Sequence, residues 1–160
     1  MNTLEIVTIP NPSLRERSRE LRVEEITNPD FQAYLDQLVY TMFKKDGVGI
    51  ASPQVGKNIR AIVVCIDGKA DCYMNPVITK RSEAMIESEE GCLSVPKQYG
   101  IVERHKKVTV EALNRFGRHE VLELRNFGAI VFQHEIDHLD GILFIDKVKE
   151  LTKDGTQPTI

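Results

Sequence analysis

The stretch 126-NFGAIVFQHEIDHL-139 decides the fold, because its spacing predicts a helix with one apolar side. Phe127, Ile130 and Val131 stand in helical register with the two histidines of HEIDH. Residues four apart on a helix project from the same face, so both imidazoles should continue the apolar stripe and point into the protein. A helix whose inward face carries two stacked histidines is therefore expected here.

The five residues 134–138 read HEIDH and match the pattern HExxH. In this pattern His134 and His138 can bind one cation, and Glu135 lies beside them to move protons of a bound water. A charged surface helix can also carry these three residues by chance. The inward register argues against that interpretation, because an unpaired buried polar group costs about 1–3 kcal/mol and a metal ion would satisfy both rings.

The sequence after the motif supplies no good third ligand. In the metzincin proteases a third histidine follows at the position that Phe144 occupies here, and Glu150 is the only glutamate that remains downstream. Upstream, Cys92 stands in the glycine-containing segment 90-EGCLS-94, which is not helical in pattern. Its thiolate could complete a site of two histidines and one cysteine with an open fourth position. Taken alone, Cys92 would be interpreted as an ordinary buried thiol.

The remaining elements predict an α+β fold. A first helix should begin at Pro29, after the capping residue Asn28, and end before Gly47. Runs of β-branched or alternating apolar residues predict four strands: Ala61–Ile66, Tyr73–Thr79, Val108–Leu113 and Glu120–Leu124. The second of these contains Pro76, which favours an edge strand or a bulge. The order helix, strands, helix favours α+β over alternating βαβ units, and 160 residues favour one domain, 1–160.

Composition excludes several classes of function. The net charge of −3, with 41% hydrophobic and 28% charged residues, is typical of a globular protein and lacks the basic footprint of a nucleic-acid binder. No apolar run approaches the roughly 20 residues that span a bilayer, and the start lacks a signal-peptide pattern, so we expect a cytoplasmic protein. Cys65 lies in an apolar run and is expected to be buried. The polar tail with Asp154, Gly155 and Pro158 is expected to be loosely held.

Three motifs together resemble one known family. They are 47-GVGIASPQ-54, 90-EGCLS-94 and 133-QHEIDH-138, and they are similar to the peptide deformylase motifs GxGxAAxQ, EGCLS and QHExDH in the same order. The first departs at Ser52, where the family has alanine, so a buried hydroxyl must find a partner. Tyr99 stands where an arginine that meets the substrate backbone is common. The resemblance implies an α+β fold with antiparallel sheets packed around the HExxH helix.

The resemblance also implies roles for particular residues. One divalent ion would be bound by Cys92, His134 and His138. Catalysis would use three further groups, namely the carboxylate of Glu135, the side-chain amide of Gln54 and the backbone N–H of Leu93. Substrate would lie in an extended conformation along Val48 and Gly49. The implied reaction removes the formyl group from an N-terminal methionine and releases formate.

The resemblance further implies ferrous iron as the native ion, with zinc, nickel or cobalt as replacements, since thiolate and imidazole ligands suit all four. The implied partners are an N-formylmethionyl peptide and the ribosome near its exit tunnel. One hypothesis pairs Asp137 with Arg104. Two alternative functions stay open: a metallopeptidase that cuts internal peptide bonds, and a non-catalytic metal-binding or ribosome-associated module.

Overall fold

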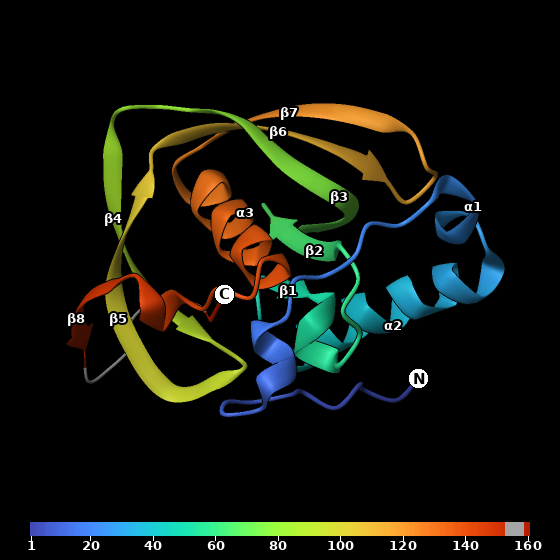
Figure 1. Ribbon diagram of the computed structural model, residues 1–160, viewed down its shortest axis with the longest axis horizontal. Coiled ribbons are helices and arrows are strands. Elements are labelled where there is room, and N and C mark those ends of the chain that lie inside the picture. Colours follow the sequence, from blue (N-terminus) through green and yellow to red (C-terminus); the bar gives the residue numbers. More distant parts are fainter. Residues whose placement is uncertain (153–158) are drawn as a thin grey trace.

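The computed structural model describes residues 1–152 and 159–160, which form two antiparallel sheets around one helix (Figure 1). The first sheet has five strands in the order β1-β2-β3-β6-β7. Their bounds are β1 Gly49–Ala51, β2 Ala61–Ile66, β3 Lys69–Arg81, β6 Lys107–Asn114 and β7 His119–Arg125. The second sheet has the order β4-β5-β8, with bounds β4 Met85–Cys92, β5 Val95–His105 and β8 Val148–Thr152.

Helix α3, Asn126–Leu139, lies between the two sheets and contacts strands of both (Figure 1). Ile130 and Val131 are buried in the main apolar cluster, as their register predicts. Phe127 departs from the prediction, because it sits in the first turn of the helix and its side chain is 40% exposed. The α+β prediction, with the HExxH helix at the centre of antiparallel sheets, is confirmed.

The other long helix is α2, Pro29–Lys44, and it begins where its capping pattern predicts. The side chain of Asn28 accepts a hydrogen bond from the backbone N–H of Asp30 at 2.8 Å, which satisfies one of the free donors of the first turn. The described chain also contains shorter helical elements: α1 Val23–Ile26 and the 3-10 turns η1 Pro12–Arg15, η2 Ser52–Val55 and η3 Phe144–Asp146.

The four predicted strands form at the predicted places in the sequence, but several are longer than predicted. Strand β2 has its predicted bounds, and the predicted hairpin forms as β6 and β7. Strand β3 extends beyond the predicted segment, and Pro76 lies at a register shift between Met74 and Val77, where a missing N–H breaks no ladder bond. Cys65 is only partly buried, contrary to expectation, because it lies near the end of β2 and packs on the border of the second apolar cluster.

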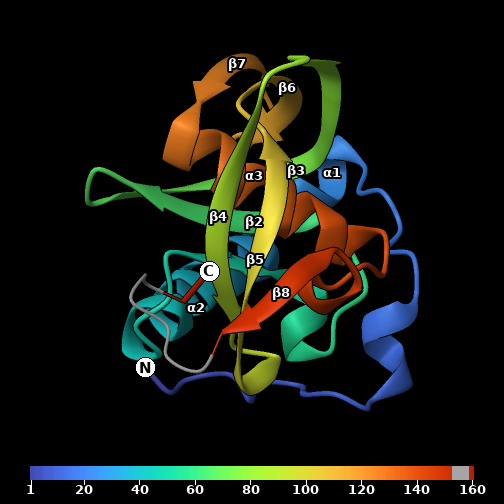
Figure 2. The same cartoon turned by 90° about the vertical axis from the view of Figure 1, so that its left-hand side faces the viewer.

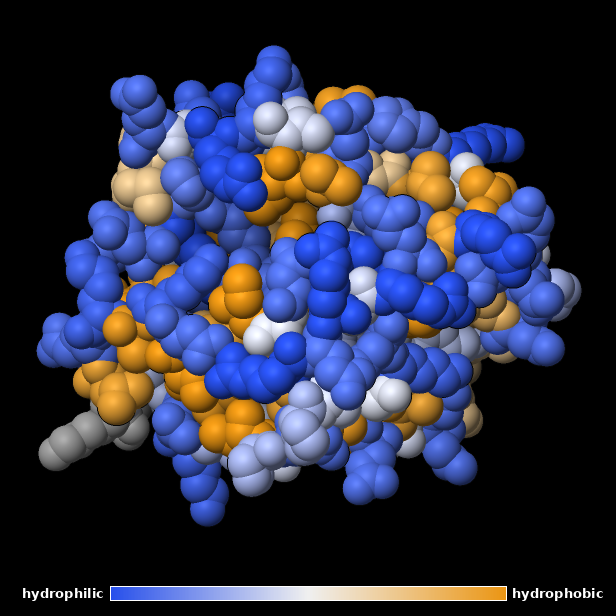
Figure 3. Space-filling view, viewed as in Figure 1, coloured by the Kyte–Doolittle hydropathy of each residue, from blue (hydrophilic) through white to orange (hydrophobic). Residues whose placement is uncertain are grey.

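The second sheet forms one side of the molecule. Figure 2 shows β4, β5 and β8 side by side, with the last residues of the chain beside β4. The face in Figure 3 is mostly hydrophilic, with small apolar areas between charged ones. No helix among the described residues is both long and apolar enough to cross a bilayer. The tail residues Asp154, Gly155 and Pro158 lie outside the described residues.

Candidate metal centre

Three potential ligands meet between β4 and α3. The sulfur of Cys92 and one ring nitrogen each of His134 and His138 lie within 4.8 Å of one another. The sulfur is 3.4 Å from Nε2 of His138. All three residues are at most 4% exposed. The structure therefore brings together the three residues that the sequence predicts as metal ligands.

Local structure explains why these side chains converge. The histidines lie one turn apart on α3, with ring centroids 5.1 Å apart. The cysteine is the last residue of β4, where the pairing with β5 shifts register between Gly91 and Cys92. Glu90, two residues earlier on β4, reaches His134 of α3. Side chains two apart on a strand lie on the same face, so alternation along β4 turns the thiol of Cys92 toward the same helix.

Unsatisfied nitrogens show that the site suits a cation. Nδ1 of His134 faces Oε1 of Glu90 at 2.8 Å, whereas its Nε2 is buried and has no hydrogen-bond partner among the described residues. A buried polar atom left in this state costs about 1–3 kcal/mol. A divalent ion between this nitrogen and the thiolate would remove that cost. Two imidazoles and a sulfur are a donor set for zinc, iron, cobalt or nickel, so the residues fit such an ion.

Burial sets the protonation states of the ligands. It lowers the pKa of His138 well below its ordinary value, and the neighbouring His134 acts in the same direction. His138 is therefore the neutral imidazole that a metal requires. Burial also raises the pKa of the Cys92 thiol to about 12. Binding of a divalent ion must reverse this and release the thiol proton, since only the thiolate is a ligand.

A buried network of charged side chains holds His134 in place through its Nδ1 atom. Arg104, which is 2% exposed, donates to both carboxylate oxygens of Glu90 at 2.9 and 2.8 Å and to Asp137 at 2.6 Å. The hypothesis that pairs Arg104 with Asp137 is confirmed. Burial by itself would raise the pKa of Glu90, but hydrogen bonds from Arg104 and His134 outweigh it and lower the pKa to about 2. The charged carboxylate holds the Nδ1–H tautomer of His134 and leaves Nε2 free for a metal.

Glu135 is poised beside the ligands. Its side chain is fully buried, and neither carboxylate oxygen has a hydrogen-bond partner among the described residues. Burial, followed by the negative charge of Glu90, raises the pKa of Glu135 well above its ordinary value. The backbone of β1 packs directly against it, because a Cβ atom on Gly49 would lie 2.5 Å from Oε1 of Glu135. Any larger residue at position 49 would therefore displace the side chain of Glu135.

Gln54 presents its side-chain amide to the same centre. In η2 its Oε1 accepts a hydrogen bond from the backbone N–H of Ala51 at 2.9 Å. This bond turns Nε2 toward the sulfur of Cys92 at 3.4 Å and the hydroxyl of Ser94 at 3.2 Å. Leu93 follows the cysteine in the tight turn between β4 and β5. The structure thus places both predicted donors next to the metal ligands.

Two residues that stabilise the site, Glu90 and Tyr34, had no role predicted from the sequence. Glu90 lies in the EGCLS motif, but its contact with His134 requires the β4–α3 packing. Tyr34 on α2 is the partner that the hydroxyl of Ser52 needs, and the two oxygens share a buried hydrogen bond of 2.5 Å. A signal existed in the sequence only for Glu90, through its place in the motif.

Tyr99, which stands at the position where the family often has arginine, packs on the strand that carries the cysteine. It pairs with Gly91 across β4 and β5, and a Cβ atom on Gly91 would lie 2.6 Å from the tyrosine ring. The ring therefore covers the backbone that immediately precedes Cys92.

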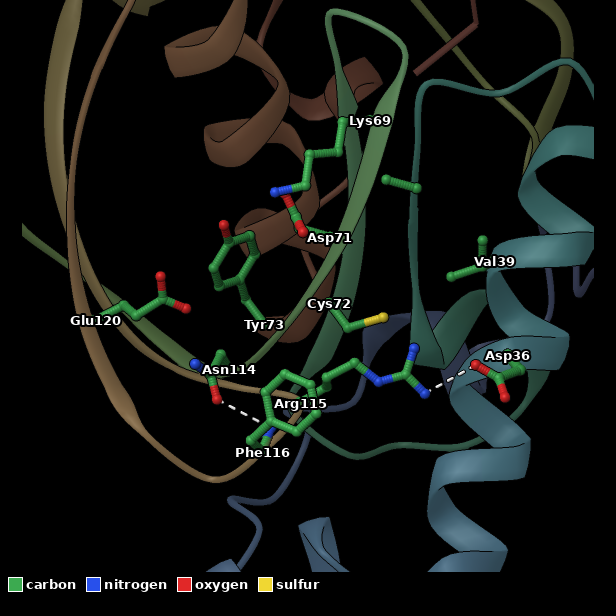
Figure 4. A pocket seen from close by; sticks show the side chains of 11 residues that line it. Asp36, Val39, Lys69, Asp71, Cys72, Tyr73, Asn114, Arg115, Phe116 and Glu120 are labelled. Atoms are coloured by element: carbon green, nitrogen blue, oxygen red, sulfur yellow. Dashed lines mark hydrogen bonds and ion pairs between the residues drawn. The ribbon is translucent and has the colours of Figure 1, made fainter.

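A hollow of about 370 Å³ lies away from these ligands between α2, β3 and the β6–β7 turn (Figure 4). Both of its cations are paired with carboxylates: Arg115 pairs with Asp36 at 2.8 Å, and Lys69 pairs with Asp71 at 3.5 Å. Cys72 points toward it, and burial raises the pKa of this thiol to about 11. The hollow therefore offers no reactive thiolate, and the metal centre remains the candidate site.

Comparison with known proteins agrees with this geometry. The family model described as polypeptide deformylase matches residues 3–154. The chain belongs to the polypeptide deformylase family. The peptide deformylase of Fusobacterium nucleatum is 48% identical over 143 residues, which cover 88% of this chain and 80% of that protein.

Solved structures of peptide deformylases share the fold. The enzyme of Thermotoga maritima is 33% identical with a TM-score of 0.88, over 93% of this chain and 99% of that one. A class I type b peptide deformylase from Acinetobacter baumannii, bound to Met-Ala-Ser, is 32% identical with a TM-score of 0.90, over 92% and 99% of the two chains. The family and the fold are therefore shown by sequence and by structure.

Proposed function

We propose that the chain hydrolyses N-formylmethionyl peptides at the centre formed by Cys92, His134 and His138. Removal of the N-formyl group, with release of formate, is the reaction of the family to which the chain belongs. The observation that carries the proposal is the buried Nε2 of His134, which has no hydrogen-bond partner in the described part of the chain. It lies close to the thiol of Cys92 and the imidazole of His138. The carboxylate oxygens of Glu135 likewise have no partner among the described residues. Such an arrangement is costly without an ion and useful with one.

We further propose ferrous iron as the native ion, with zinc, nickel or cobalt able to take its place. When bound, the ion supplies Lewis-acid polarisation and acidifies water so that hydrolysis proceeds near neutral pH. The described residues offer one sulfur and two nitrogens as ligands. Three protein ligands are typical of a catalytic site, in which a further position stays open for solvent or substrate.

Glu135 is proposed to move the protons of the reaction. Its carboxylate would accept a proton from the attacking water and give it to the amine that leaves. An acid–base group works best when its pKa is near the operating pH, and burial raises the pKa of Glu135 from the ordinary carboxyl range. Since its two oxygens have no other partner among the described residues, no existing hydrogen bond must break first.

Gln54 and Leu93 are proposed to stabilise the charge that develops on the formyl oxygen. The amide nitrogen of Gln54 is oriented in advance, because the N–H of Ala51 holds the other end of the side chain. The backbone N–H of Leu93 would be the second donor. Donors placed before the reaction stabilise a developing oxyanion without any cost of reorganisation, and one such donor contributes about 10²–10³ in rate.

Val48 and Gly49 are proposed to line the peptide itself. Val48 precedes β1 and Gly49 is its first residue. Because β1 is an edge strand of the first sheet, an extended peptide can form backbone hydrogen bonds with it. The proposal also includes residues 1–160 acting as one catalytic domain, a cytoplasmic location, and action on nascent chains near the ribosomal exit tunnel. These last points rest on the resemblance to the family.

The test is formate release from formyl-Met-Ala-Ser by protein reconstituted with ferrous iron under anaerobic conditions. We expect turnover by the wild type and a loss of at least about 100-fold in Glu135→Gln, since acid–base catalysis contributes roughly 10²–10⁴. Absence of formate from freshly loaded wild type would refute the proposal. Cleavage of internal bonds in unformylated peptides would instead support the metallopeptidase alternative.

Metal content tests the ligand set separately. Cys92→Ser should lose most of the bound metal, measured by plasma mass spectrometry after gel filtration, because a serine hydroxyl is a poor substitute for a thiolate. Cys72→Ser is the matched control, since that thiol is also buried but lies outside the centre. Equal metal content in the two variants would contradict the role of Cys92.

A further inference from the structure

The described residues Thr159 and Ile160 lie against the candidate site. Thr159 forms a parallel bridge with Gly47, and its carbonyl accepts a hydrogen bond from the N–H of Val48 at 3.1 Å. The N–H of Ile160 donates to the carbonyl of Gly91 at 3.2 Å. Figure 2 shows this end of the chain beside β4. Two residues thus connect the start of β1 with the end of β4.

The two backbone groups that hold this segment border the reactive centre. Val48 immediately precedes Gly49, whose backbone packs on Glu135, and Gly91 immediately precedes the ligand Cys92. We call the N–H of Val48 and the carbonyl of Gly91 the Val48–Gly91 edge. A peptide that adds to the border of a sheet binds through such groups. The segment therefore occupies the N–H of Val48, a residue that the proposed function assigns to substrate, and the carbonyl of Gly91 beside it.

The side chain of Ile160 fills an apolar position. It is 2% exposed and belongs to the main core cluster, together with Ile130 of α3, and Val48 packs against that cluster. Beside it opens a cavity of about 270 Å³, which Ile86 and Phe127 also line. Apolar side chains are held in such positions because burial removes their surface from water. The segment is therefore anchored by its side chain as well as by its backbone.

We propose that Thr159–Ile160 is an intramolecular competitor of the substrate peptide. This inference rests on the proposed function of the site. The segment and an extended peptide with an apolar first residue need the same N–H, the same carbonyl and the same apolar position, so they exclude each other. If the segment is docked about nine-tenths of the time, the apparent Kd of a peptide rises about tenfold. The turnover number at saturating substrate is unaffected.

The decisive variant is Ile160→Asp, which places a charge in the apolar position. The matched control is Val23→Asp on α1, an exposed aliphatic residue in a part of the molecule far from the segment (Figure 1). Binding of the product-type peptide Met-Ala-Ser to the zinc-loaded proteins, each comprising residues 1–160, is measured by calorimetry. This readout needs no hydrolysis, so it succeeds or fails independently of the proposed reaction. Hydrogen exchange of the Val48 amide is measured in parallel.

The expected result is that Ile160→Asp binds Met-Ala-Ser several-fold to about tenfold tighter than wild type, and that Val23→Asp does not. The Val48 amide should exchange faster in Ile160→Asp and regain protection when the peptide binds. Ile160→Ser, which removes the anchor without adding charge, replaces the aspartate variant in both measurements if that variant fails to fold. Affinity in the folded variant that equals or falls below that of wild type, or unchanged Val48 exchange, would overturn the proposal.

Discussion

Replacing Gly49 by alanine tests how closely β1 confines the proposed acid–base group. The added Cβ would lie 2.5 Å from Oε1, 2.9 Å from Cδ and 3.0 Å from Cγ of Glu135. Ordinary contact begins near 3.4 Å, so the carboxylate must move by about 0.9 Å, the difference between 3.4 and 2.5 Å. Because Glu135 is fully buried beside the proposed ligands, its displaced carboxylate must leave the position it holds at the metal centre.

The displacement should act on activity more than on folding. A misplacement of about 1 Å costs about 100-fold in rate when a group must meet the substrate in a set geometry. Overpacking of a core typically costs about 1–3 kcal/mol of unfolding free energy. We therefore expect Gly49→Ala to fold, to bind metal through the unchanged ligands, and to lose about two orders of magnitude in kcat/KM.

The assay is formate release by iron-loaded protein, with metal content and thermal unfolding measured on the same samples. Gly128→Ala is the matched control, since it makes the same change on α3 itself. There the new Cβ meets the far end of Ile66 at 3.3 Å and Leu124 at 3.7 Å, both flexible side chains. Alanine in a helix is favoured over glycine by up to about 1 kcal/mol, so this variant should keep its activity and its stability.

The reasoning would be refuted by a folded, metal-loaded Gly49→Ala that retains activity within about threefold of wild type. That result would mean either that Glu135 can move without consequence or that it does not handle the protons. Loss of activity together with loss of metal would place the damage in the ligands instead. Equal losses in the Gly128 control would point to general disturbance of the core.

Three further outcomes follow from buried or paired groups. Ser52→Ala leaves the hydroxyl of Tyr34 unpaired, so chemical denaturation should show a loss of about 1–3 kcal/mol, much of which adding Tyr34→Phe restores. Arg104→Met removes the cation from two carboxylates and should cost about 3–5 kcal/mol in the same assay, whereas a loss under 1 kcal/mol would contradict the network. A hydrogen bond from Arg15 lowers the pKa of Asp146 in the folded protein. The ionised Asp146 therefore contributes its full share to the free energy of unfolding above the unfolded carboxyl pKa of about 3.9. This contribution is lost as the pH falls through the lower pKa of the folded state. The difference in melting temperature between wild type and Asp146→Asn should therefore be constant from about pH 7 to 5 and shrink below about pH 4; a difference that grows on acidification would exclude this pairing.

The sequence by itself determined the local elements of the site. Helical register placed His134 and His138 on one inward face, because side chains four apart project together in any helix. The capping pair of Asn28 and Pro29 determined where α2 begins, since the cap bond spans only two residues. The resemblance of three motifs to the family predicted Cys92 as a third ligand, and its sulfur lies 3.4 Å from Nε2 of His138.

Only the tertiary structure decided which distant groups meet. The contact of Glu90 with His134, the partner of Ser52 on α2, and the docking of Ile160 beside Gly91 all join residues far apart in the chain. Their meeting depends on how β4, α2 and the last residues pack around α3. A pattern of spacing records which face a residue takes on its own element, but it does not record which other element covers that face. Packing between elements therefore determined the environment of the proposed ligands, while periodicity along one element predicted the two histidines and the family motifs predicted Cys92.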